Sequence, residues 1–156
     1  MRPKLGSFDI HFVFNARTHL LKCFDATGKC HWMVEAHGEG TNGPGYNVVG
    51  GDTPPGLYTG SSPEAIPPSD NEANAYGPYF VNLVEMEKQE SSRGRAGVGV
   101  HGGGSGLPNP YFSKHQGWVH THGCIRLQNE DLERFVNAVR YSQRRKGAAY
   151  LTVSWV

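Results

Sequence analysis

The sequence has few charged residues and almost no net charge. Asp, Glu, Lys and Arg make up 19% of its 156 residues, against about 25% in an average soluble domain. Fifteen basic residues face 14 acidic ones, so the formal net charge is +1. Nucleic-acid-binding domains usually carry a basic excess or a basic stripe. The one basic cluster, residues 144–146, is typical of a helix C-terminus, and we expect no nucleic-acid partner.

Long apolar runs are also missing. No stretch approaches the roughly 18 apolar residues that mark a membrane-spanning helix, so we expect no membrane span. Residues 1–6 contain no apolar segment of the kind that defines a secretory signal peptide. These absences leave three interpretations: a cytosolic protein, a processed fragment, or a protein exported by a route that needs no such signal.

Cysteine is scarce as well, because three cysteines cannot build a disulfide framework. Cys23 and Cys30 flank a turn, and one of the strand pairings that this turn allows would place them opposite each other. A cross-strand disulfide and two separate thiols therefore both remain open. Cys124 is left over, and an unpaired cysteine in a chain with histidines elsewhere is a candidate nucleophile.

Glycine, in contrast, is abundant and unevenly placed. Of 21 glycines, eight lie in residues 38–60 and seven in residues 94–106. Aromatic residues at 11% and hydrophobic residues at 37% are too frequent for a disordered chain. The composition indicates one loop-rich, mainly β domain covering residues 1–156, with two glycine-rich segments.

Alternating apolar residues and turn signals predict a chain of short strands. The first three form an antiparallel meander, and three more follow after the irregular segments 38–60 and 61–74. The predicted strands cover residues 8–14, 19–24, 30–36, 79–87, 97–101 and 148–156, with a polar turn at 91–95.

One helix is predicted near the end of the chain. Asn129 is a good N-cap, acidic residues follow it in the first turn, and Gly147 is a plausible terminator. An apolar face with helical spacing is formed by Leu132, Phe135, Val136 and Val139.

Four of the eight histidines gather just before Cys124, at positions 101, 115, 120 and 122. One interpretation is a zinc hydrolase that uses His101, His120 and His122, since residues two apart on a strand share a face. No acidic residue stands ready to orient such ligands. The other four histidines, His11, His19, His31 and His37, are interpreted as ordinary surface or core residues.

A second interpretation makes Cys124 a nucleophile. A cysteine attacks as the thiolate, so it needs a base or a cation nearby. His101, at the end of a predicted strand, could be that base, and Gly123 permits close backbone approach. Arg126 would share a face with Cys124 in an extended segment and could bind a substrate carboxylate. The alternative is that Cys124 is a buried apolar side chain.

The nearby glycines do not form a phosphate loop. Residues 97–102 match G-x-G-x-x-G literally, but that pattern is meaningful only between a strand and a helix. More glycines and Pro108 follow, and they cannot open a helix.

The segment 121–127 (THGCIRL), preceded by His101-Gly102, resembles the catalytic signature of the L,D-transpeptidases, the YkuD family. That signature is a His-Gly, a gap, then Ser or Thr followed by His-Gly-Cys, an apolar residue, and Asn or Arg. Residues 53–58 (TPPGLY) resemble the family's Thr-Pro-x-Gly-x-aromatic segment. The resemblance implies a mainly β, single-domain β-sandwich with one principal helix after the cysteine motif.

The resemblance also implies the roles of single residues. Cys124 would be the nucleophile and His101 the general base, and His122 would help to shape the catalytic site. The backbone N–H groups of Gly123 and Cys124 would stabilise the oxyanion. Substrate binding would involve Gly123 and three further residues, Thr121, Arg126 and Gly102.

The implied substrate is the peptide stem of peptidoglycan, and no cofactor is implied. The acyl-enzyme would pass to an amine, to water or to a D-amino acid, in the periplasm or cell wall of its own or a target cell. An antibacterial effector would in addition meet a secretion machinery or an immunity protein. A non-catalytic module that binds cell-wall peptides is the further alternative.

The sequence departs from the family in the length of one gap. Nineteen residues separate His101 from Thr121, which is longer than usual, and they include His115, Trp118 and His120. A lid over the site and a plain surface insertion are the two interpretations. If the family assignment is correct, both glycine-rich segments should border the cleft of Cys124.

Overall fold

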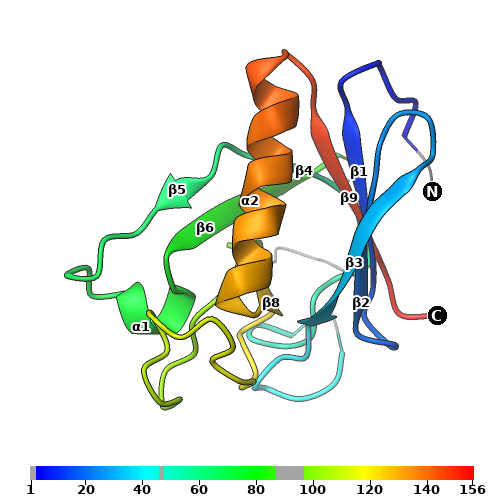
Figure 1. The fold of residues 1–156 in the computed structure, drawn as a ribbon. Helices are drawn as coiled ribbons and strands as arrows, with labels where there is room; N and C mark the ends of the chain where they lie inside the picture. Colours follow the sequence, from blue (N-terminus) through cyan, green and yellow to red (C-terminus); the bar gives the residue numbers. More distant parts are fainter. Residues whose placement is uncertain (1–2, 46–47, 87–96) are drawn as a thin grey trace.

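The computed structural model describes residues 3–45, 48–86 and 97–156, which form a mainly β domain with one long helix (Figure 1). The predicted turn at 91–95 lies outside the described residues. No helix in these ranges has the length and apolar character needed to cross a membrane. The strands are β1 (Ile10–Asn15), β2 (Leu20–Phe24), β3 (Cys30–His37), β4 (Gly56–Gly60), β5 (Glu64–Ala65), β6 (Tyr79–Glu85), β7 (Gly99–His101), β8 (Ile125–Leu127) and β9 (Ala149–Ser154), and the helices are α1 (Ala73–Tyr76) and α2 (Asn129–Arg144).

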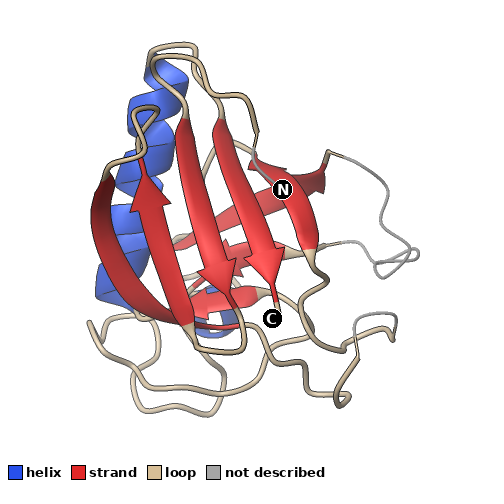
Figure 2. Cartoon of the chain, turned by 90° about the vertical axis from the view of Figure 1, so that its right-hand side faces the viewer, coloured by secondary structure: helices blue, strands red, loops and turns tan. Residues whose placement is uncertain are grey.

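The strands form one sheet that closes on itself. Their order is β4-β9-β1-β2-β3-β8-β7-β6-β5, and β4 also pairs with β6. The pairs β1–β9 and β7–β8 are parallel, whereas β1, β2 and β3 form the antiparallel meander that the sequence predicts. The result is a barrel-like β-sandwich, which confirms the predicted fold class (Figure 2).

Helix α2 contributes its apolar face to the core. Leu132, Phe135, Val136 and Val139 are buried among strand residues from both ends of the chain. The Phe135 ring lies 4.3 Å from that of Phe12 in β1. The helical spacing of these four residues is therefore confirmed as a packing surface, and it holds α2 along the strands (Figure 1).

Strands β4 and β8 were not predicted from the sequence. β4 lies at the end of the segment that the sequence suggested was irregular, and it pairs with both β9 and β6. β8 has only three residues, all buried, between β3 and β7. β8 is too short to show an alternation, and in β4 the consecutive residues Leu57 and Tyr58 are both buried, so pairing with distant strands defines both.

The predicted N-cap of α2 is wrong by one residue. Gln128 holds the N-cap position, and its side chain makes no capping bond. Asn129 is the first helical residue and is buried; its Oδ1 accepts the Gly103 N–H at 3.0 Å, and its Nδ2 donates to the Pro110 and Ser113 carbonyls at 2.7 Å each. Its amide therefore ties a distant loop to the helix start instead of capping the helix.

The C-terminal end of α2 places a lysine where glycine is preferred. Lys146 has φ of 61°, and the N–H groups of Lys146 and Gly147 donate to the carbonyls of Gln143 and Ser142, which is a Schellman motif. The predicted terminator, Gly147, is the residue after the left-handed position. A Cβ there would lie 2.5 Å from the Phe8 carbonyl oxygen, so glycine is required for close approach.

Lys146→Gly is expected to stabilise the protein by about 1 kcal/mol, because a left-handed conformation costs an L-residue roughly that amount. Urea unfolding monitored by circular dichroism measures the change. Arg145→Gly is the matched control: Arg145 has φ of −103°, so glycine there should not stabilise. An equal gain in both variants would contradict this explanation.

Cys23 and Cys30 are separate thiols. A bulge between Cys23 and Phe24 shifts the register, so Cys23 pairs with Trp32 and Phe24 with Cys30. Both cysteines are free, Cys23 buried and Cys30 exposed. Burial raises the pKa of Cys23 to about 12, so this thiol stays protonated and unreactive.

Candidate active site

The residues of the cysteine motif line a cleft of about 630 Å³. Asn42, Val49 and Gly50 come to it from the first glycine-rich segment, and Gly97 and Ser105 from the second. The expectation that both segments border the cleft of Cys124 is thus confirmed. The remaining lining residues are Ala75, Tyr76, His101, Val119, His120, Thr121, His122, Cys124 and Arg126.

Parallel pairing of β7 with β8 brings His101 to the cysteine motif. Val100 pairs with Ile125 and His101 with Arg126, so β7 ends beside the strand that begins directly after Cys124. Neighbouring parallel strands bring residues that are far apart in sequence to one edge of the sheet. The predicted position of His101 at a strand end is confirmed.

His101 is buried, with 2% of its surface exposed. Its Nδ1 lies 2.8 Å from the Gly102 carbonyl oxygen. Because a carbonyl can only accept, Nδ1 carries the proton and Nε2 has the lone pair in the neutral ring. Burial, reinforced by the Arg126 charge, lowers the pKa of His101 to about 3. The imidazole is therefore neutral at physiological pH, the form in which it can accept a proton.

This lowered pKa predicts acid sensitivity of the fold. In the unfolded chain His101 has its ordinary pKa of 6.5, against a pKa of about 3 in the folded protein. Between pH 6.5 and about pH 3 the unfolded state therefore binds more protons than the folded state. The contribution of His101 to stability is fully present above this pH range and is lost as the pH falls through it. Between about pH 7 and pH 5 the loss attributable to His101 is about 2 kcal/mol.

Urea unfolding of wild type and His101→Gln at several pH values tests this expectation. The variant should show a flatter dependence of the unfolding free energy on pH over this range, whatever its absolute stability. Parallel curves for the two proteins would contradict it.

The turn that carries Cys124 is held by two threonines. Thr121 Oγ1 accepts the Gly123 N–H at 3.0 Å and donates to the Cys124 carbonyl at 2.8 Å. Thr53 Oγ1 lies 2.6 Å from the Gly123 carbonyl oxygen. Gly123 has φ of 114°, which only glycine adopts readily. Thr53 was recognised only as part of a motif; the structure adds that this fully buried residue supports the cysteine turn.

These bonds bear on two predicted roles. Thr121 orders the turn, so a role in substrate binding stays a prediction. The Gly123 N–H already donates to Thr121 Oγ1, so it could donate to an oxyanion only by sharing its hydrogen between the two acceptors. Cys124 is 9% exposed, and its thiol donates to the Gly97 carbonyl at 3.3 Å.

Arg126 is buried, with 4% of its surface exposed. Its guanidinium donates to the carbonyls of Gly102 at 3.3 Å, Ala75 at 3.1 Å and His120 at 3.5 Å, and also to that of Val119. Burial lowers its pKa to about 10, so it remains charged at neutral pH. It binds three separate segments of the cleft wall together, which the sequence motif did not indicate.

Gly102 fits a space that no other residue could occupy. A Cβ there would lie 2.1 Å from Asn129 Oδ1. Its N–H donates to the Tyr76 carbonyl at 2.9 Å, and its carbonyl accepts from both His101 and Arg126. The predicted site residue Gly102 therefore joins the His101 imidazole and the Arg126 guanidinium through its backbone.

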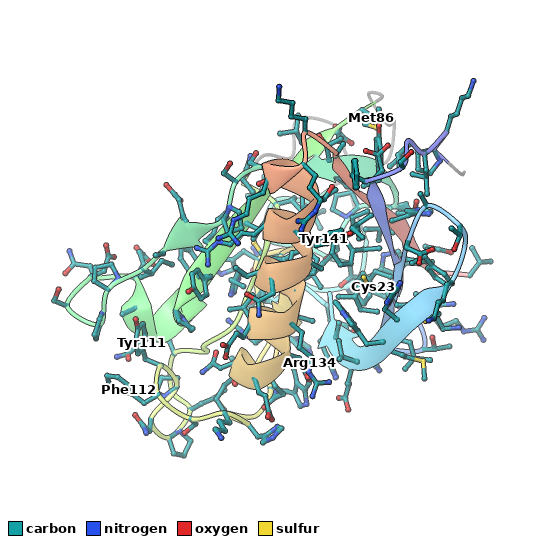
Figure 3. All side chains as sticks on the ribbon, turned by 45° about the horizontal axis from the view of Figure 1, so that its top comes forward. Cys23, Met86, Tyr111, Phe112, Arg134 and Tyr141 are labelled. Carbon is teal, nitrogen blue, oxygen red and sulfur yellow. The ribbon has the colours of Figure 1, made fainter. Side chains whose placement is uncertain are left out.

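The long gap before Thr121 forms part of the cleft wall. Val119 and His120 line the cleft, and Gln116 is buried, donating to the carbonyls of Gly103 and Leu127. Earlier in this segment, Tyr111 and Phe112 lie side by side on the outside of the molecule (Figure 3), with ring centroids 4.8 Å apart. The segment is thus partly site and partly surface.

The zinc-hydrolase interpretation gains no support from the geometry. Over the described ranges, the one group of His, Cys, Asp or Glu close enough to share a metal ion is His19, His37 and Glu39. His101, His120 and His122 do not form such a group: His101 is buried, whereas His122 and His120 are exposed. His122 nevertheless lines the cleft, as predicted.

Comparison with solved structures shows the same fold in several bacterial proteins. Bd1075 from Bdellovibrio bacteriovorus superposes with a TM-score of 0.65 at 12% identity, over 97% of this chain and 49% of that one. The helical cell shape determining protein Pgp2 from Campylobacter jejuni gives 0.63 at 19% identity, over 93% and 47%. An L,D-transpeptidase from Stackebrandtia nassauensis gives 0.54 at 15% identity, over 93% and 55%. This chain thus spans about half the length of these relatives.

A comparison with curated proteins gave no match. The family described as YkuD, L,D-transpeptidase catalytic domain, matches residues 9–147. That range contains the cleft, the cysteine turn and the His-Gly loop. The chain therefore belongs to the YkuD family of L,D-transpeptidase catalytic domains.

Proposed function

We propose that this domain transfers peptidoglycan stem peptides through an acyl-enzyme on Cys124. The observation that carries the proposal is a cleft that joins a cysteine on a glycine turn to a buried, neutral imidazole with its Nδ1 proton fixed. Acyl transfer needs a nucleophile, a base and donors for the developing oxyanion. Family membership supports a substrate from the bacterial cell wall.

In the proposed reaction, His101 Nε2 accepts the Cys124 thiol proton as sulfur attacks the carbonyl of the stem residue before the terminal D-alanine. The Cys124 N–H donates to the oxyanion. The Gly123 N–H already donates to Thr121 Oγ1, so it can reach the oxyanion only by sharing its hydrogen between the two acceptors. The peptide bond breaks, and His101 returns the proton to the departing D-alanine amine. The acyl group remains on sulfur until an acceptor attacks it.

The acceptor decides the product. An amine from a second stem gives a cross-link, water gives a shortened stem, and a D-amino acid gives an exchanged stem. We propose that the reaction takes place in the periplasm or cell wall, of the producing cell or of a cell into which the domain is delivered as an antibacterial effector. Delivery would involve a secretion machinery and an immunity protein as further partners.

Purified muropeptides with tetrapeptide stems, incubated with the protein and analysed by mass spectrometry, test this function. Loss of D-alanine, accompanied by a cross-link, a hydrolysed stem or an exchanged residue, is the expected result. Chelator-sensitive cleavage that survives Cys124→Ala would favour a metal hydrolase. Binding of muropeptides without any turnover would favour a non-catalytic module, and either outcome would overturn the proposal.

A further inference from the structure

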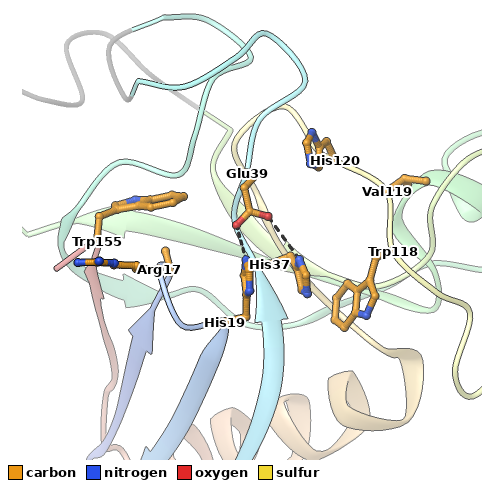
Figure 4. Close-up of a pocket in the computed structure, with 9 residues that line it drawn as sticks. Arg17, His19, His37, Glu39, Trp118, Val119, His120 and Trp155 are labelled. Atoms are coloured by element: carbon orange, nitrogen blue, oxygen red, sulfur yellow. Dashed lines mark hydrogen bonds and ion pairs between the residues drawn. The ribbon is translucent and has the colours of Figure 1, made fainter.

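A second cavity, of about 550 Å³, shares part of its wall with the cleft of Cys124. Val119 and His120 line both cavities. Its walls are otherwise formed by Ala16, Arg17, His19, His37, Glu39, Trp118 and Trp155 (Figure 4). The proposed acyl transfer uses none of these titratable side chains.

Two histidines and a glutamate converge in this cavity. Glu39 Oε1 lies 2.7 Å from His19 Nε2, and Glu39 Oε2 lies 3.3 Å from His37 Nδ1 (Figure 4). One nitrogen from each ring and one carboxylate oxygen lie within 4.8 Å of one another. Two imidazoles and one carboxylate form a ligand set that zinc accepts, with a further position left open.

The backbone of His19 adopts a left-handed conformation that places its side chain in this cavity. His19 precedes β2 with φ of 59°, an uncommon conformation for a residue other than glycine. Its carbonyl accepts the Ala36 N–H at 3.1 Å, which brings the residue beside His37 at the end of β3. The two rings stack with centroids 4.0 Å apart and planes at 10°. Strained positions of this kind gather at functional sites.

His37 also has the supporting partner that metal-binding histidines usually have. Its Nε2 lies 2.6 Å from Glu35 Oε2, while Nδ1 faces Glu39. Metal-ligating histidines commonly donate the other ring N–H to a carboxylate, which fixes the tautomer. The indole of Trp118 also stacks on His37, with ring centroids 4.0 Å apart. The His37 imidazole therefore contacts both Trp118 and His19.

We propose that His19 Nε2, His37 Nδ1 and Glu39 bind a divalent ion of the zinc class, with Glu35 as the orienting carboxylate. The ion would take the place of the protons between these atoms. The rings would turn out of their parallel stack, because an imidazole binds a metal in its own plane. Nitrogen ligands favour zinc or cobalt over magnesium and calcium. Since Trp118 packs on His37, the bound ion would fix the wall shared with the catalytic cleft.

Titration of the untagged Cys124→Ala protein with Zn²⁺ by calorimetry, and with Co²⁺ by visible absorption, tests this site. The substitution removes the catalytic thiol as a competing ligand. One ion per chain is expected, with a cobalt spectrum that lacks the charge-transfer band of a thiolate. His37→Gln and Glu39→Gln should abolish saturable binding. Glu35→Gln should weaken it about 10- to 100-fold.

His31→Gln is the matched control. His31 pairs with Asp25 at 2.7 Å on the surface and should leave the affinity unchanged. Circular dichroism confirms that each variant is folded. Three results would overturn the proposal: no saturable binding by the Cys124→Ala protein, binding that requires Cys124, or undiminished binding in folded Glu39→Gln.

Discussion

Cys124→Ala is expected to abolish release of D-alanine from muropeptides, with a loss of at least ~10³-fold in kcat/KM, the scale seen when a covalent nucleophile is removed. The physical reason is that alanine offers no atom to form the acyl-enzyme. Stability should change little, because the thiol is small and its hydrogen bond to the Gly97 carbonyl is long, at 3.3 Å. Mass spectrometry of the products and thermal unfolding of the variant measure the two effects.

Cys30→Ala is the matched control for this prediction. Cys30 is an exposed free thiol at the start of β3 and should tolerate alanine with full activity. Trapping of the acyl-enzyme supplies a second test. In mass spectrometry of the intact protein, an acyl adduct should add mass to wild type and to Cys30→Ala but not to Cys124→Ala. Turnover that survives Cys124→Ala would contradict a thiol mechanism.

Arg126→Met is expected to lower the free energy of unfolding by about 3–5 kcal/mol, because several buried carbonyls lose their donor at once. Methionine fills similar space but leaves buried carbonyls without their donor, and an unsatisfied buried polar group costs about 1–3 kcal/mol. The carbonyls of Gly102, Ala75 and His120 belong to separate segments of the cleft wall. Urea unfolding measures the loss, and kcat should fall with it.

Arg126→Lys and Arg134→Met are the controls. Lysine keeps the charge but has no planar fork of donors, so it should restore only part of the stability. Arg134 is an exposed residue of α2, 3.8 Å from Asp131, and its loss should cost little. A stable Arg126→Met protein with only a raised KM would indicate that the guanidinium binds the substrate and does not organise the wall.

The sequence by itself determined the elements with strong local signals. The alternation of residues 8–36 predicted the meander, and the spacing of Leu132, Phe135, Val136 and Val139 predicted the buried face of α2, because these patterns repeat over several residues. The Thr-His-Gly-Cys segment likewise indicated the family that residues 9–147 match. Where the local alternation was weak or absent, as in β4 and β8, the prediction missed the strand.

Only the tertiary structure decided what several chemically suggestive residues do. The expectation that Arg126 binds a substrate carboxylate stays a prediction, and the structure adds that its donors meet backbone carbonyls from three separate segments. His19 and His37, expected to be ordinary, are stacked against each other beside Glu39. The partners of a side chain can lie far away in the sequence, as Arg126 and Ala75 do at a separation of 51 residues, and the folding of the chain brings them together. Local sequence patterns contain no information on such long-range contacts. The sequence therefore identified the candidate residues, whereas the pairing of strands in the closed sheet determined which residues contact them.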